Sequence, residues 1–194
     1  MSVLALLVST AFIGGEPTAA LQDPEPRSPN SYVFHIGARV LDDADFYEPV
    51  EDDGVLGFEY VRDFSGGSSA AGLGLEFGAF LAGDSDEILG SDIVAAFLEG
   101  SVGLRAHLDA GRFQFFAGAG PTFILAAFDI ENGPDDSDTS AGFYVHGGST
   151  FRLDDDIALG LDLRAVAGTD ISFSGFVGTD ADYGQVSLIL EINP

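Results

Sequence analysis

Residues 141–163 read AGFYVHGGSTFRLDDDIALGLDL. On both sides of the three consecutive aspartates, apolar side chains alternate with small or polar ones. Successive side chains of a β-strand point to opposite faces, whereas a helix repeats every 3.6 residues, so this period of two predicts strands. The aspartate cluster marks a turn between them. The stretch therefore predicts a hairpin of two antiparallel strands with one apolar face.

The same alternation recurs along residues 31–193, in eight segments of roughly 9 to 15 residues, long enough for tilted strands to cross a bilayer. The uncharged run 113–128 is too short for a membrane-spanning helix, and Gly118, Gly120 and Pro121 interrupt it. We interpret this run as a strand with a bulge or a lost hydrogen bond near Pro121.

The connections between the segments alternate in length. Those at 42–54, 83–92, 129–140 and 169–182 are long, and those at 65–70, 109–112 and 154–156 are short. Consecutive strands of an up-and-down meander turn at opposite ends, so the long loops lie at one end and the short turns at the other. The sequence predicts an all-β fold, an eight-stranded antiparallel up-and-down β-barrel with both chain ends at the short-turn end.

The charge of the chain is strongly negative. Its 194 residues carry 32 acidic and 7 basic side chains, for a net charge of −25, and every basic residue is an arginine. A chain without a basic patch cannot neutralise phosphates, which excludes nucleic-acid binding. The absence of cysteine excludes disulfides, thiolate metal sites and a cysteine nucleophile. Most acidic residues fall in the long loops, so an apolar band is bounded by an acidic rim.

Two kinds of barrel share this alternation. An exported, lipocalin-like lipid-binding barrel buries its apolar face, whereas a membrane barrel turns that face to lipid. The polar face here combines glycines with charged residues, which suits a narrow lumen where small residues leave room and opposite charges pair. We therefore predict a transmembrane barrel and keep the soluble barrel as the alternative. The predicted lumen charge network comprises Arg39, Glu59, Glu76, Glu99, Arg105, Arg152, Asp162, Arg164 and Glu191.

The N-terminal segment differs from the rest. An uncharged apolar stretch followed by small residues predicts a signal peptide over 1–20, with a buried strand or helix as the alternative. A proline-rich tether is expected over 21–30 and the barrel over 31–193.

At this point the chain resembles the small outer-membrane β-barrel proteins, the group that contains the OmpA transmembrane domain, OmpX and the opacity-type porins. The resemblance lies in residues 113–123 (FQFFAGAGPTF) and in the hairpin 141–163. It implies a barrel in the bacterial outer membrane, surrounded by outer-membrane lipid. Because the chain has no tryptophan, any aromatic girdle uses tyrosine and phenylalanine.

Candidate sites for chemistry are few. His35, His107 and His146 fall on the polar face, where a metal site or a general base is one interpretation and hydrogen bonding in the lumen is the favoured one. Some lipid-modifying enzymes of this fold place a histidine toward lipid, and none faces outward here, so we expect no enzyme activity, no metal site and no cofactor. The acidic loops could bind divalent cations or form a solvated rim, and the residues concerned are Asp42, Asp43, Asp45, Asp84, Asp86, Asp135, Asp136 and Asp138.

The sequence thus predicts a monomeric outer-membrane barrel with a filled polar lumen, acidic extracellular loops and a structural or surface-interaction role. The alternatives are the exported lipocalin-like barrel and a narrow outer-membrane channel.

Overall fold

The computed structural model describes residues 28–41, 52–65, 69–88, 91–130, 136–171, 179–180 and 182–194. The long strands are β1 Asn30–Leu41, β2 Asp52–Asp63, β3 Ala71–Ile88, β4 Ser91–Ala110, β5 Phe113–Ile130, β6 Asp136–Arg152, β7 Ile157–Ala167 and β10 Tyr183–Ile192. A separate two-residue pair, β8 Asp170–Ile171 and β9 Thr179–Asp180, lies in the connection between β7 and β10. Within the described ranges, no helix is long and apolar enough to cross a membrane.

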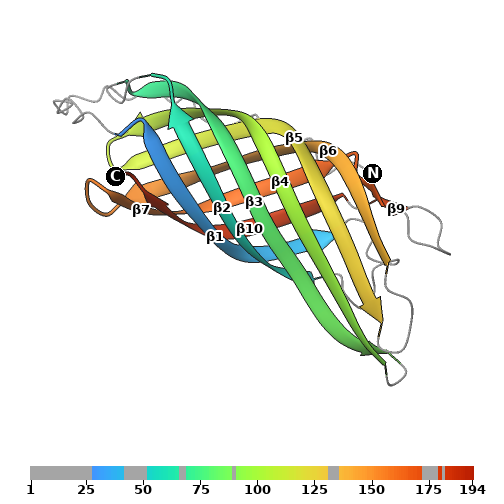
Figure 1. Cartoon of the computed structure of the whole chain (residues 1–194). Helices are drawn as coiled ribbons and strands as arrows, with labels where there is room; N and C mark the ends of the chain where they lie inside the picture. The colour runs from blue at the N-terminus through green and yellow to red at the C-terminus, as the bar shows by residue number, and fades with distance from the viewer. Residues whose placement is uncertain are drawn as a thin grey trace, which may run out of the picture.

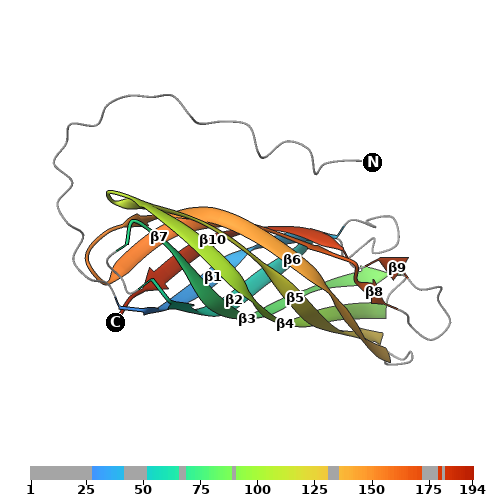
Figure 2. The ribbon, with the colours of Figure 1, turned by 90° about the horizontal axis from the view of Figure 1, so that it is seen from above.

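The eight long strands form a closed barrel (Figures 1 and 2). Each strand pairs antiparallel with its neighbour in the chain, and β10 closes the sheet onto β1. The predicted eight-stranded antiparallel up-and-down barrel is therefore confirmed. A two-residue turn joins β4 to β5, and its Gly111 adopts a φ of +66°, which favours glycine.

The strands are inclined because the pairing is staggered around the barrel. A row of paired residues that starts at Asn30 returns to β1 at Val40, ten residues further along. A stagger of this kind requires strands that tilt against the barrel axis. The row runs through Arg62, Leu75, Leu104, Ala119, Val145, Ala165 and Gly184.

The two faces of the wall have opposite chemistry. Large apolar side chains point outward and stay exposed, such as Ile36 (60 %) and Leu161 (53 %). Charged side chains point inward and are buried, such as Glu99 (0 %) and Asp162 (1 %). The facing predicted from the alternation is therefore confirmed on the described strands. The interior of this barrel therefore contains buried charged side chains, whereas the core of a water-soluble protein is mostly apolar.

Strands β3 to β6 are longer than the alternation predicts. They have 17 to 20 residues, whereas β1, β2, β7 and β10 have 10 to 12. The extra length lies at the long-loop end, where β3 continues to Ile88 beyond its last pair with β2 at Gly83. The expected loops 83–92 and 129–140 are therefore partly strand (Figure 1). Beyond the rim neither face of a strand has to be apolar, so backbone pairing continues without the pattern that reveals strands.

The pairing between β4 and β5 is interrupted at Pro121. Ser101 pairs with Thr122 and Leu104 with Ala119, but the residues between them do not pair. Two residues lie between these pairs on each strand, so no residue is inserted and a bulge is absent here. The interruption matches a proline, which has no backbone N–H to donate.

Candidate functional site

The inward-facing charged side chains form a buried network across the lumen. Two apolar clusters flank it along the barrel axis. The cluster at the short-turn end consists of Val33, Val61, Phe116 and Ile189. The cluster at the long-loop end consists of Val55, Phe80, Ala82, Phe97, Ile124, Ala126, Tyr144, Val166 and Tyr183. Apolar side chains therefore pack around the network toward both ends of the lumen, and Tyr144 and Tyr183 belong both to a cluster and to the network.

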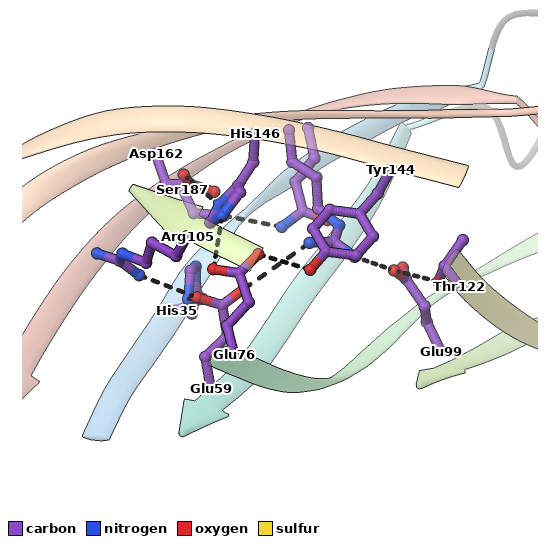
Figure 3. A network of polar contacts seen from close by, with 12 residues as sticks. His35, Glu59, Glu76, Glu99, Arg105, Thr122, Tyr144, His146, Asp162 and Ser187 are labelled. Carbon is purple, nitrogen blue, oxygen red and sulfur yellow. Dashed lines mark hydrogen bonds and ion pairs between the residues drawn. The ribbon is translucent and has the colours of Figure 1, made fainter. Parts of the chain in front are cut away.

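Glu99 of β4 has the largest number of polar partners. Its Oε1 accepts hydrogen bonds from Arg164 Nη2 at 2.5 Å and from Thr122 Oγ1 at 2.9 Å (Figure 3). Its Oε2 accepts one from Arg39 Nη2 at 3.0 Å and another from the Tyr183 hydroxyl. Two arginines from distant strands thus share one carboxylate that water does not reach.

Glu59 of β2 lies near one histidine and two arginines, at distances longer than those of the hydrogen bonds that Glu99 accepts. Its Oε2 is 3.3 Å from His35 Nε2 and 3.6 Å from Arg105 Nη1, and its Oε1 is 3.8 Å from Arg164 Nη1. Arg164 therefore lies between Glu59 and Glu99. A charge-assisted hydrogen bond is about 2.7–2.9 Å long, so these contacts are ion pairs rather than good hydrogen bonds.

Glu76, His146 and Asp162 form a triad. His146 Nε2 is 3.0 Å from Glu76 Oε2, and His146 Nδ1 is 3.0 Å from Asp162 Oδ1. The Tyr144 hydroxyl donates to the other oxygen of Glu76 at 2.5 Å. Glu76 belongs to β3 and His146 to β6, strands that do not pair, so this contact crosses the lumen (Figure 3).

Aromatic rings cover the arginines. The guanidinium carbon of Arg39 lies 3.7 Å from the centre of the Tyr183 ring, and that of Arg105 lies 3.8 Å from the Phe116 ring. Arg164 lies 3.9 Å from the Tyr144 ring. Guanidinium groups are weakly hydrated and stack on aromatic faces, so these rings replace part of the water shell and fill the lumen.

Seven of the nine residues predicted for the lumen network take part in these contacts. The other two, Arg152 and Glu191, join none of these ion pairs. Arg152 is half-buried as the last residue of β6. Glu191 is buried, and its Oε2 has no hydrogen-bond partner in the described part of the chain.

Sequence reasoning missed Tyr183, which donates to Glu99 and covers Arg39. It is the first residue of β10, directly after a long loop. The alternation of that strand, continued two residues back from Gln185, would have placed Tyr183 on the inward face.

The histidines contact carboxylates. His107 Nε2 lies 3.7 Å from Asp63 Oδ2 near the short-turn end, whereas His35 and His146 belong to the central network. Among the described residues, no group of three or more histidine, cysteine, aspartate or glutamate side chains is arranged to hold a metal ion.

The acidic residues proposed for cation binding are largely beyond structural description. Asp42, Asp43, Asp45 and Asp135 lie outside the described residues. Asp84, Asp86 and Asp136 belong to β3 and β6 by their backbone, and their side chains are outside the described part. Asp138 accepts a hydrogen bond from the backbone N–H of Thr139 at 2.8 Å.

A small polar cavity opens at the short-turn end of the lumen. Its volume is about 40 Å³, and its lining includes Arg105, His107 and Glu191. A void of this size has room for only a few water molecules.

Known proteins resemble this chain in fold but not in sequence. No protein-family model and no curated protein sequence matches the chain. Ail of Yersinia pestis, the attachment invasion locus protein, aligns with a TM-score of 0.55 at 14 % identity over 87 % of this chain and 98 % of Ail.

Two further barrels align nearly as well. Neisserial surface protein A gives a TM-score of 0.54 at 10 % identity over 85 % of this chain and 96 % of its own. The N-terminal β-barrel domain of OprF from Pseudomonas aeruginosa gives 0.52 at 9 % identity over 87 % and 99 %. Together with the closed topology and the outward apolar face, these likenesses show that the chain has the fold of the small eight-stranded outer-membrane β-barrel proteins.

Proposed function

We propose that this protein is an integral outer-membrane barrel with a closed lumen, and that it has a structural or surface-interaction role. The observation that carries the proposal is the inverted distribution of side chains. Leucine, isoleucine, valine and phenylalanine cover the outside of the wall, while arginine and glutamate are buried inside it. Only a surrounding hydrocarbon phase makes this arrangement favourable.

The outward face argues against the exported lipocalin-like barrel. Soluble monomers rarely expose a continuous apolar patch larger than a few hundred Å². Here the outward apolar residues continue around all eight long strands, from Phe34 on β1 to Leu188 on β10. A lipid-binding barrel also needs an apolar cavity, whereas this lumen holds ion pairs and aromatic rings.

The packing of the lumen supports a closed barrel rather than a channel. Phe80 and Tyr144 are each 1 % exposed, and Arg164 lies between their rings and two glutamates. Hydrated ions would have to displace these groups, and separating the buried charges would be costly.

The proposal includes the orientation and the ends of the chain. Long loops face the cell exterior and short turns face the periplasm. Residues 1–20 act as a signal peptide and 21–30 as a tether, and the barrel is monomeric. Ail was solved in complex with a heparin analogue, sucrose octasulfate. The acidic loops of the present chain repel such a polyanion, so we propose divalent cations or basic surfaces as their partners.

Membrane fractionation tests the location. The full chain should sediment with outer membranes and migrate differently on a gel before and after boiling. A protein that stays soluble without detergent would support the lipocalin-like alternative.

Planar-bilayer recording at neutral pH tests the closed lumen. The unmodified protein should give no stable conductance. A large and steady single-channel conductance would overturn the closed lumen and support the narrow-channel alternative.

Protease treatment of intact cells tests the orientation. Cleavage is expected within 42–53 or 129–140. Cleavage confined to 109–112 or 154–156 would reverse the topology, and permeabilised cells serve as the control in which both ends are accessible.

A further inference from the structure

His146 is held between two carboxylates in the middle of the lumen. We propose that the triad of Glu76, His146 and Asp162 is a proton-dependent gate, which keeps the lumen closed while the imidazole is protonated and opens a cation-preferring path when that proton is lost. This inference rests on the proposed closed lumen.

The first argument is the geometry of the ring. Both nitrogens of His146 lie 3.0 Å from a carboxylate oxygen. An ionised carboxylate only accepts hydrogen bonds, and a neutral imidazole has a single N–H to donate. With both carboxylates ionised, the two contacts are satisfied together only when both ring nitrogens carry a proton, and the ring is then an imidazolium.

His146 differs from the other two histidines in this respect. His35 contacts Glu59 through Nε2, and its Nδ1 has no hydrogen-bond partner among the described residues. His107 is partly exposed near the short-turn end and faces Asp63 at 3.7 Å. His146 is thus the histidine whose two contacts both depend on its charge.

The second argument is the charge balance of the lumen. The charged or titratable groups around His146 come from six of the eight long strands: Glu76 from β3, Asp162 and Arg164 from β7, Glu59 from β2, Arg105 from β4, His35 from β1 and Tyr144 from its own strand, β6. The ion-pair network around His146 contains four carboxylates, Glu59, Glu76, Glu99 and Asp162, and three arginines, Arg39, Arg105 and Arg164. One protonated histidine, His146, makes this sum neutral, so the loss of its proton leaves one uncompensated negative charge.

The third argument is the position of the triad across the lumen. It connects β3 with β6 and β7, which lie across the lumen from β3 (Figure 3). A β-carbon at Gly118 of β5 would collide with His146 Nε2 and Glu76 Oε1, so the triad lies directly against that strand. When the ring is neutral, one of its two contacts becomes a carboxylate facing a lone pair. The connection across the lumen is then weakened, and the Tyr144–Glu76 hydrogen bond remains.

The direction of the pH effect follows from the protonated state. Closure is favoured while the pH is below the titration of the closed-state triad, and it weakens as the pH rises through that point. Release of one proton changes the ratio of open to closed barrels by about tenfold per pH unit. The excess of carboxylates makes the open lumen attract cations.

The experiment records the full-length protein in planar bilayers from pH 6 to pH 10 in potassium chloride. The wild type should be closed at neutral pH and should open as the pH rises, with a reversal potential that shows preference for potassium. His146→Gln removes the charge and should be open already at neutral pH. Glu76→Gln should stay closed at alkaline pH, because a neutral ring can then donate to Asp162 and accept from the new amide.

Two controls separate the gate from general damage. His107→Gln changes a histidine near the short-turn end and should keep the wild-type pH profile. If His146→Gln does not insert, the opposite effect expected of Glu76→Gln still tests the gate. Nitrogen NMR of histidine-labelled protein, with the His146 signal assigned by its absence in the variant, should show both ring nitrogens protonated at neutral pH.

The outcomes distinguish the two proposals. Steady conductance of the wild type at neutral pH would refute the closed lumen itself. Closure of the wild type at neutral pH would agree with the closed lumen. Even then, any one of three results would refute the gate: the wild type stays closed up to pH 10, Glu76→Gln keeps the wild-type pH profile, or the His146 ring is neutral at neutral pH. Anion preference of the open state would also refute the gate.

Discussion

At the scale of single residues, two buried glutamates show that the energetic cost of a buried charge depends on its hydrogen-bond and ion-pair partners. Glu99 accepts hydrogen bonds from Arg39, Arg164 and Thr122. Glu191 is 5 % exposed, and its Oε2 has no hydrogen-bond partner in the described structure. A buried charge is tolerated when it is paired and is costly when it is not.

We therefore predict opposite effects of the same substitution. Glu99→Gln leaves the buried Arg39 without a carboxylate and Arg164 with only its longer contact to Glu59, and should lower the free energy of unfolding by about 3–5 kcal/mol. Glu191→Gln removes an unpaired charge and should be neutral or stabilising. Urea unfolding in lipid vesicles measures both, and equal losses would contradict the assigned pairings.

Two glycines of β4, Gly103 and Gly100, differ in whether an added side chain would meet other atoms. A β-carbon at Gly103 would meet the Tyr144 hydroxyl and, at 2.9 Å, the backbone carbonyl carbon of Ala119. A β-carbon at Gly100 would have no atom within 4 Å. Gly103 therefore faces a filled interior, and Gly100 faces outward.

The corresponding prediction uses alanine at each position. Gly103→Ala should cost about 1–3 kcal/mol through overpacking. Gly100→Ala should change stability little, because the added methyl group meets no protein atom. Thermal unfolding in the same detergent compares the variants, and a destabilising Gly100→Ala would show that the outward face is packed against something.

At the scale of elements, the continuity of the sheet depends on backbone donors. Pairing of β5 with β6 continues through Pro121, but pairing of β5 with β4 stops between Thr122 and Ala119. The register is the same on both sides of the interruption, so the neighbouring pairs hold the strands in place.

Pro121→Ala should repair this interruption. The new N–H should pair with β4 and stabilise the barrel by about 0.5–1.5 kcal/mol. Hydrogen exchange of the new amide is the measurement, and protection comparable to that of Leu104 is expected. An amide that exchanges as fast as one in a turn would show that crowding at this position, rather than the missing donor, separates the strands.

At the scale of the whole molecule, the outward apolar band determines where the barrel is stable. Leu161 lies in the middle of β7 and is 53 % exposed, whereas Leu153 lies in the short turn before it and is 48 % exposed. Both are equally accessible in water, so only a surrounding bilayer distinguishes them.

The distinction is testable with one charge at two depths. Leu161→Arg should cost about 2–4 kcal/mol in a bilayer, and Leu153→Arg only about 0–1 kcal/mol, because the cost of a charge falls toward the interface. Reversible unfolding from lipid vesicles gives both values. Similar costs at the two positions would refute the membrane orientation of the barrel.

The sequence by itself determined the strands, their facing and the antiparallel order. In 141–163 the period of two holds on both sides of the aspartate turn, because one face of each strand meets an apolar phase and the other a polar lumen. It also determined which charges point inward. Alternate residues of a strand point to opposite faces, so the position of Arg164 or Glu76 relative to the apolar residues of its strand assigns it to the inward face. The alternation did not find the ends of β3 to β6, because beyond the rim no apolar phase selects the residues.

Only the tertiary structure decided which inward charges meet. The ten-residue stagger between Asn30 and Val40 brings Glu76 of β3 against His146 of β6, and Arg39 of β1 against Glu99 of β4. A change of stagger would leave every facing intact and replace every partner. The reason is physical: alternation is a local property of each strand, whereas contact across a lumen depends on the closure of the entire sheet.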